Sequence, residues 1–265
     1  MDWQMLAQEI ESHTRPDTFP LAIRVVKPPE SLPARLKRPA ADLGVRVSIC
    51  QGISMARRYG WAIGMGGEDL QCPIAQVAFG FEPAVPFYTE GNLAAGMYVE
   101  ACGQGALTEA EVPKFTADEA GVVCVAPLAR ATFEPQVVLV YGNSAQVMRL
   151  AAAALWKTGG ALTTRTTARA DCADIVIRPL REDAPQVILP CYGDRVFGQT
   201  QDHEMAFCFP ARMAGDLLEG LKGTQKGGIR YPIPTYLRYQ AEFPETYRKL
   251  QELWAQGSPD AKDTP

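Results

Sequence analysis

Cysteines are the residues of this sequence whose chemistry is most distinctive. The chain of 265 residues contains seven cysteines and only two histidines, His13 and His203. So few histidines disfavour a histidine-rich zinc site and histidine-based acid–base catalysis. In a reducing compartment, cysteines are buried thiols, reactive thiols or metal ligands rather than disulfides. We therefore expect any chemistry of this chain to involve sulfur.

Four cysteines stand where one expected element meets the next. They are Cys50, Cys72, Cys172 and Cys191, each close to Gly, Pro or Asp. Backbone N–H groups at the edge of an element lower a thiol pKa and donate hydrogen bonds to bound sulfur. The four are too dispersed for a compact motif. Their context is compatible with a shared metal or cluster site and also with independent buried or reactive thiols.

The other three cysteines have different surroundings. Cys124 and Cys208 lie inside apolar segments that predict strands, and we expect both to be small core residues. Cys102 lies in Glu100-Ala101-Cys102-Gly103 and could replace one of the four.

A second type of candidate site is the turn between an expected strand and helix at 142–146. Free N–H groups at a helix start can bind an anion, and Asn143, Ser144 and Gln146 are the candidate ligand-binding residues there. Ordinary helix capping by Asn143 or Ser144 explains the same residues.

Common catalytic motifs are absent from the sequence. No GxGxxG follows an expected strand, and there is no P-loop, HExxH, GxSxG or CxxC. No clustered cysteine run supports a ferredoxin module. Nucleotide-binding and hydrolase folds recognised by these motifs are therefore disfavoured.

The pattern of apolar residues predicts an α+β fold of mixed sheets with packed helices. The expected strands are 21–27, 45–49, 122–126, 136–141, 162–166, 186–189 and 205–209. The first dozen residues are expected to form a helix that Pro16 and Pro20 end. The other expected helices are 51–63, 73–81, 144–156, 212–222 and a stretch that ends near Trp254. Gly64, Gly66 and Gly67 are expected to end the helix at 51–63, and 223–228 is expected to be a flexible link.

The chain is expected to form a single domain over 1–255, followed by a flexible tail at 256–265. A weak internal echo suggests two similar halves, 20–120 and 121–225, with Cys72 and Cys172 in corresponding places.

Net charge and hydropathy limit the partners. The net charge is −4 and the pI is about 5.4, which disfavours a broad nucleic-acid surface and a polybasic membrane anchor. No long apolar run predicts a membrane span, and the N-terminus does not resemble a signal peptide. We expect a cytoplasmic protein without nucleic-acid or membrane partners.

Several segments, in order, resemble the DUF169 family, which has no assigned activity. The most specific are Tyr141-Gly142-Asn143-Ser144-Ala145-Gln146 and Pro190-Cys191-Tyr192-Gly193-Asp194-Arg195. The resemblance runs from about residue 20 to 250 and implies family cysteines at Cys50, Cys72, Cys172 and Cys191. It supplies no substrate and no reaction. Members are familiar from anaerobic microbes, which would suit an oxygen-sensitive cluster.

These observations lead to an iron–sulfur protein as the first hypothesis. A 4Fe–4S cluster held by the four thiolates would have a redox or substrate-binding role, and zinc or no metal is the alternative. Arg149 and Arg195 could offset cluster charge or bind an acidic ligand, although surface ion pairing is the more ordinary explanation of both. Asp171, Asp174 and Asp194 would oppose thiolate formation unless a cation offsets them.

Two further hypotheses remain open. One is a metal-free binding protein or enzyme for a small anionic ligand. The other is an accessory electron-relay subunit with a redox partner protein. Self-association of the chain and the question of enzymatic activity are open in all three.

Overall fold

A computed structural model describes residues 1–233 and 242–257. The described residues form an α+β fold, as the sequence predicts, built on a six-stranded antiparallel sheet. The strands are β1 (Leu21–Val26), β2 (Ile63–Met65), β3 (Val122–Pro127), β4 (Val137–Gly142), β5 (Gln186–Ile188) and β6 (Met205–Pro210). Their order across the sheet is β2-β3-β1-β4-β6-β5.

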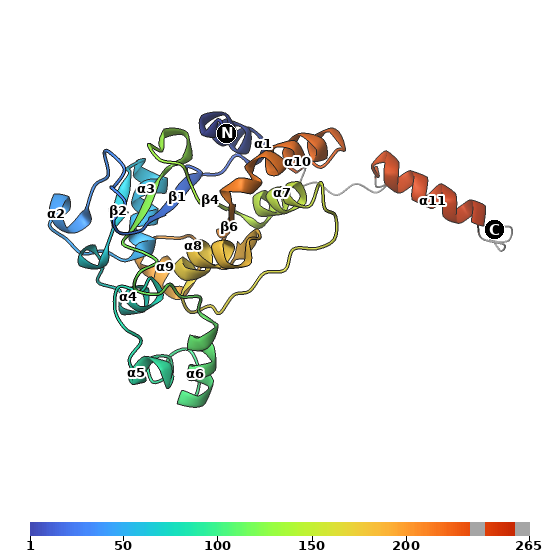
Figure 1. Ribbon diagram of the computed structural model, residues 1–265. Helices are drawn as coiled ribbons and strands as arrows, with labels where there is room; N and C mark the ends of the chain where they lie inside the picture. The colour runs from blue at the N-terminus through green and yellow to red at the C-terminus, as the bar shows by residue number, and fades with distance from the viewer. Residues whose placement is uncertain (234–241, 258–265) are drawn as a thin grey trace.

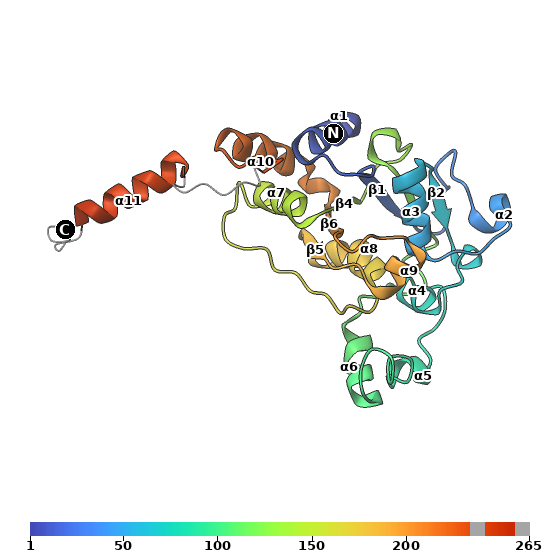
Figure 2. The same ribbon diagram turned by 180° about the vertical axis from the view of Figure 1, so that it is seen from behind.

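Helices cover both faces of the sheet, which makes a three-layer sandwich (Figures 1 and 2). One outer layer contains α1 (Trp3–Thr14), α7 (Ser144–Ala154) and α10 (Ala214–Lys226). The other contains α3 (Ile49–Tyr59), α4 (Pro73–Ala78), α8 (Asp171–Glu182) and α9 (Tyr192–Phe197). The short α2 (Pro39–Leu43) lies beyond β2, and α11 (Glu245–Gly257) has no buried residue.

Alternation of side chains along the strands creates the two cores. In β4, Leu139 packs toward the α3 and α8 layer, whereas Val138 and Val140 pack toward α1, α7 and α10. Successive residues of a strand point to opposite faces, so a strand buried on both faces is continuously apolar. All six residues of β4 are buried.

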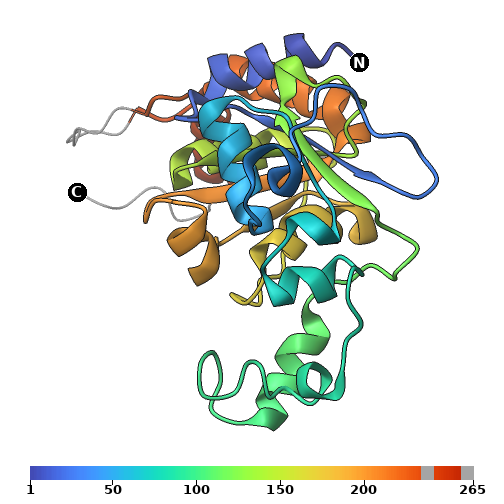
Figure 3. The ribbon, with the colours of Figure 1, turned by 90° about the vertical axis from the view of Figure 1, so that its left-hand side faces the viewer.

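A small helical insertion projects from the layer that contains α4. It consists of α5 (Pro86–Thr89), α6 (Cys102–Glu111) and their connections, and it lies apart from the sandwich in Figure 3. The sequence between 82 and 120 carries many Gly and Pro residues, so periodicity did not predict these helices.

The sheet repeats one arrangement on its two sides. Going outward from the centre, the order is β1, β3, β2 on one side and β4, β6, β5 on the other. Between the central and edge strands of each side, the chain forms two helices, α2 and α3 or α7 and α8, and another helix follows each edge strand, α4 or α9. By this correspondence Cys50 matches Cys172, and Cys72 matches Cys191. The weak similarity between the two halves of the sequence had instead predicted that Cys72 corresponds to Cys172.

Two expected strands are wrong. Residues 45–49 form no strand, because Ser48 caps α3 and forms a capping box with Gln51, so the helix begins at Ile49. Residues 162–166 also lack strand structure. There the Thr164 hydroxyl donates a hydrogen bond to the Val187 C=O and accepts one from the Val187 N–H. A side chain thus makes the hydrogen bonds that the backbone of a neighbouring strand would otherwise make.

Two helix ends also differ from expectation. Gly60, with φ of +73°, ends α3, so Gly64 lies instead in strand β2. Helix α10 continues to Lys226, and the expected flexible link at 223–228 is therefore mostly helical. The last expected helix is α11, and the expected tail at 256–265 lies outside the described residues from 258 onward.

Close packing of α7 on α10 predicts opposite effects for two glycines of α10. A Cβ at Gly220 would lie 1.9 Å from the Ala153 carbonyl oxygen, whereas one at Gly215 meets nothing closer than Met1 Cε at 3.8 Å. We expect Gly220→Ala to lower the free energy of unfolding by about 1–3 kcal/mol. Gly215→Ala should leave it unchanged or raise it by up to about 1 kcal/mol. Urea denaturation of both variants measures this, and equal effects would contradict the packing argument.

Candidate functional site: a cavity lined by four cysteines

The four cysteines singled out by the sequence line one cavity of about 230 Å³: Cys50, Cys72, Cys172 and Cys191. Cys50, Cys172 and Cys191 are each 8% exposed, and Cys72 is half-buried. All are free thiols. Chain segments as distant as residues 50 and 191 thus contribute to one site.

Each cysteine lies at the start of a helix. Cys50 and Cys172 are the second residues of α3 and α8, and Cys72 and Cys191 are the N-cap residues of α4 and α9. The first-turn N–H groups of a helix have no intrahelical acceptors and carry the positive end of the helix dipole. The two longer helices, α3 and α8, therefore direct partial positive charge toward a place where thiolates would be negative.

Polar neighbours contact two of the sulfur atoms. Cys50 Sγ lies 2.9 Å from Ser48 Oγ, and Cys191 Sγ donates to Asp171 Oδ1 at 3.0 Å. Asp171 Oδ2 is buried and has no hydrogen-bond partner among the described residues. The cavity thus contains a buried acceptor whose hydrogen-bonding capacity is not fully used.

Burial raises the pKa of three of these thiols, Cys50, Cys172 and Cys191, and so favours their protonated forms. It raises the pKa of Cys172 well above its usual value, with a further contribution from the Asp171 charge. Burial and the Asp171 carboxyl raise the pKa of Cys191 to about 12, although backbone N–H groups of Asp171 and Asp194 oppose the shift. Burial and then the Asp194 charge also raise the pKa of Cys50. A metal that binds here must displace these protons.

Apolar side chains form much of the remaining wall: Ile74, Leu93, Met97 and Phe197. Met97 and Phe197 are 66% and 56% exposed, so they lie where the cavity meets solvent. Arg169 and Tyr98 also line the cavity. Met97 and Tyr98 belong to the insertion that contains α5 and α6, so this insertion contributes one side of the opening.

The buried aspartates near the cysteines differ in their partners. Asp174 accepts two hydrogen bonds from the Arg178 guanidinium. Asp194 accepts hydrogen bonds from Tyr141 and Thr200, each at 2.9 Å. Burial raises the pKa of Asp171 well above its usual value, and the nearby Asp194 charge adds to the rise. A raised pKa favours the protonated, uncharged form of Asp171, and that form does not contribute to the repulsion that the sequence predicts.

The remaining cysteines lie elsewhere. Cys124 and Cys208 are fully buried in β3 and β6, which confirms the expectation that they are core residues. Cys102 is exposed at the start of α6, and its Sγ contacts Asn92. It does not line the cavity, so the structure offers no support for exchanging it with one of the four.

The other five candidate residues do not line the cavity. Asn143 caps α7 by accepting from the N–H groups of Ala145 and Gln146, and Gln146 completes a capping box. Ser144 is an exposed residue of the first turn. This arrangement matches the capping interpretation.

The two candidate arginines have local acceptors. Arg149 is fully buried in the opposite layer, where its guanidinium donates to Thr224 Oγ1 and the Leu221 carbonyl. Arg195 donates to the Gln201 carbonyl at 2.8 Å. Arg169, which precedes Cys172 by three residues, is the arginine at the cavity. Arg169 was not among the candidates predicted from the sequence, although its proximity to Cys172 along the chain was a usable signal.

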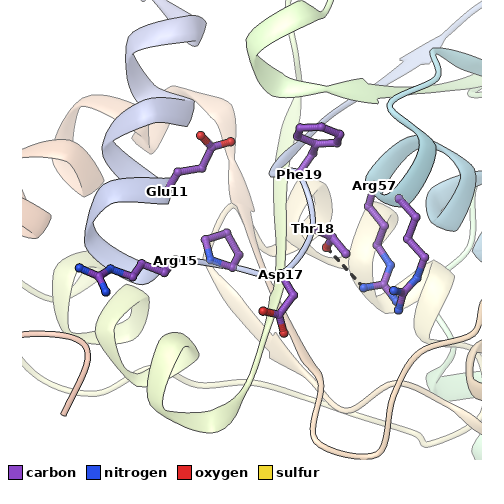
Figure 4. A pocket seen from close by; sticks show the side chains of 8 residues that line it. Glu11, Arg15, Asp17, Thr18, Phe19 and Arg57 are labelled. Atoms are coloured by element: carbon purple, nitrogen blue, oxygen red, sulfur yellow. Dashed lines mark hydrogen bonds between the residues drawn. The ribbon is translucent and has the colours of Figure 1, made fainter. Parts of the chain in front are cut away.

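A second hollow, of about 600 Å³, lies between the end of α1 and the end of α3 (Figure 4). Both acidic and basic residues line it: Glu11, Arg15, Asp17, Arg57 and Arg58. Arg57 Nη1 lies 3.5 Å from Thr18 Oγ1, and the same guanidinium forms a buried ion pair with Glu204. This mixed-charge hollow contains no cysteine, and its principal cation already has a partner.

No group of three or more His, Cys, Asp or Glu surrounds a point suited to one metal ion within residues 1–233 and 242–257. Zinc requires this convergence, because Zn–S bonds of about 2.3 Å bring tetrahedral ligands within about 4 Å of one another. A cubane cluster occupies the volume between its ligands, so its cysteines need only surround a cavity. Four thiols around one cavity provide soft donor atoms, although they do not converge on a single ion among these residues.

The sheet, its two helical layers and the four-cysteine cavity define an α+β protein with a sulfur-lined internal site. The chain belongs to the DUF169 family, described as uncharacterised ArCR, whose model matches residues 9–220. This confirms the resemblance seen in the sequence.

A curated relative is an uncharacterized protein of Methanocaldococcus jannaschii. It is 27% identical over 112 residues, which cover 42% of this chain and 48% of the relative. The matched region thus spans about half the length of that relative. No solved structure matches the chain. Among the described residues, no helix has the length and apolar character needed to cross a membrane.

Proposed function

We propose that this protein binds one iron–sulfur cluster, of the 4Fe–4S type, through Cys50, Cys72, Cys172 and Cys191. The observation that carries this proposal is that four thiols from four helix starts line one cavity. Four cysteine ligands are the usual complement of a cubane. Soft thiolate ligands favour iron–sulfur groups over hard cations such as magnesium.

The surroundings of the cysteines also suit a cluster. Two of the four cysteines belong to the half of the sheet with β1, β3 and β2, and two belong to the half with β4, β6 and β5. The proposed ligands thus follow the symmetry of the strand order. Backbone N–H groups of Asp171 and Asp194 lie close enough to Cys191 to lower its pKa. Hydrogen bonds of this kind tune the potential of a cluster. A redox role or substrate binding at the cluster is the activity that we propose.

Iron and sulfide analysis of protein purified without oxygen tests the proposal. We expect about four iron and four inorganic sulfide atoms per chain, a brown colour and an absorption band that bleaches on reduction. Zinc at about one atom per chain, without sulfide, would instead support the metal alternative named above. Colourless, metal-free protein after reconstitution with iron and sulfide would contradict both.

A second candidate function is a metal-free site for a small anionic ligand in the same cavity. Arg169 favours this alternative, since it is a buried cation among apolar walls. Guanidinium groups bind carboxylates through paired hydrogen bonds. Protection of unloaded protein against thermal unfolding by acetate or benzoate, but not by acetamide or benzamide, would support this candidate.

A further inference from the structure

Arg169 is held in an unusual position for a charged residue. It lies immediately before the N-cap residue of α8, is 6% exposed and lines the cysteine cavity. Among the described residues that line this cavity, it is the one with a positive charge. A buried guanidinium is costly unless nearby negative charge offsets it.

Two residues of the insertion fix the guanidinium in place. Its Nε donates to Glu109 Oε1 at 3.0 Å, and its central carbon lies 4.6 Å from the centre of the Tyr98 ring. Glu109 is 1% exposed, and its Oε2 has no hydrogen-bond partner among the described residues. The ion pair thus joins the Nε of Arg169 to one of the two carboxylate oxygens of Glu109.

The hydroxyl of Tyr98 is influenced by both the cavity sulfur and the guanidinium. Burial raises the pKa of Tyr98, a negative charge on Cys191 would raise it further, and Arg169 lowers it. Tyr98, Arg169 and Cys191 all line the same cavity, so the guanidinium and the cysteine sulfur border one enclosed space.

We propose that Arg169 is the positioning residue that offsets the negative charge of the cluster, and that Glu109 limits this offset. The inference rests on the proposed function and adds the residues that would set the reduction potential. A cubane with four thiolate ligands is negatively charged and becomes more so on reduction. A fixed cation stabilises the reduced form, and a fixed anion destabilises it, most strongly where water is excluded.

The test is the midpoint potential of the loaded full chain in four variants. Arg169→Gln should lower the equilibrium constant for one-electron reduction about tenfold, which is a fall of about 59 mV. Glu109→Gln should shift the potential in the opposite direction. Arg169→Lys should keep most of the wild-type value. Lys157→Gln removes a cation that pairs with Asp216 in the opposite layer, so it should leave the potential unchanged.

Charge compensation requires that Arg169→Gln and Glu109→Gln shift the midpoint potential in opposite directions, whereas a purely structural role does not. Shifts in the same direction for Arg169→Gln and Glu109→Gln, or no shift in either, would overturn the inference while the cluster itself remained established. If Arg169→Gln does not fold, a rise in potential in Glu109→Gln supports the inference, and an unchanged or lower value overturns it. Wild-type protein that takes up no iron would remove the proposed function and this inference together.

Discussion

Protein in which alanine replaces Cys172 should emerge from oxygen-free purification with less than about a tenth of the wild-type iron and sulfide. Loss of a residue that only supports a ligand already weakens metal binding about 10- to 100-fold, so loss of a ligand should do at least as much. Cys172 is the second residue of a twelve-residue helix and is buried at the cavity. No described cysteine outside the other three lines that cavity and could replace it.

Cys208→Ala is the matched control for this variant. Cys208 is also buried, and it lies in β6 without lining the cavity. We expect this control to keep its iron even though it loses some packing. Iron and sulfide assays, together with circular dichroism of both variants, make the comparison. Equal iron in the two folded variants would exclude Cys172 as a ligand.

The second large effect concerns a buried ion pair at the end of α3, beside the mixed-charge hollow. Arg57 and Glu204 are 1% and 4% exposed, and Glu204 accepts hydrogen bonds from Arg57 and Arg58. Glu204→Gln leaves the Arg57 charge buried without its partner. Removing one member of such a pair costs about 3–5 kcal/mol, so we expect a loss of this size in the free energy of unfolding.

The loss should depend on pH in a defined direction. Burial raises the pKa of Glu204, but the Arg57 hydrogen bonds, the Gln201 N–H and the arginine charges together lower it below its usual value. A carboxyl with a depressed pKa stabilises the fold above its unfolded pKa of about 4.3, and the stabilisation is lost as the pH falls through the folded value. The difference between wild type and Glu204→Gln should therefore be largest near pH 7 and shrink below about pH 4.

An exposed ion pair serves as the control for Glu204→Gln. Asp183 and Arg212 pair at the surface and are 61% and 60% exposed. Asp183→Asn should change the free energy of unfolding by less than about 1 kcal/mol, because solvent screens exposed pairs. Denaturant unfolding of both variants at pH 7 and pH 4 measures the contrast. Similar small losses in both would show that the Arg57–Glu204 pair contributes no more than an exposed one.

Local sequence signals predicted the elements whose own residues determine them. Asn143 and Gln146 form a capping box before an apolar periodic segment, so the start of α7 was correctly predicted. The continuous apolar runs of β3 and β4 predicted strands that are buried on both faces. The four cysteines were selected because they lie at element boundaries, and those boundaries converge in space.

Other features depend on contacts that a single sequence does not reveal. Helix α8 contains the β-branched run Ile175-Val176-Ile177 and Pro179, both unfavourable in an isolated helix. Burial of this run and the pairing of Arg178 with Asp174 stabilise it. Arg169 could not be placed because its partners, Glu109 and Tyr98, lie in the segment whose helices periodicity did not predict.

The mirrored strand order has a consequence for the origin of the site. Each side of the sheet supplies one cysteine in the first turn of a helix and one immediately before another helix. A chain of half this length could therefore assemble with an identical copy and offer two thiols from each to a common centre. Fusion of two such ancestors would have freed each half to diverge. In such a history, the α5–α6 insertion would be a later addition, because among the described residues of the other side no helix lies between α9 and β6.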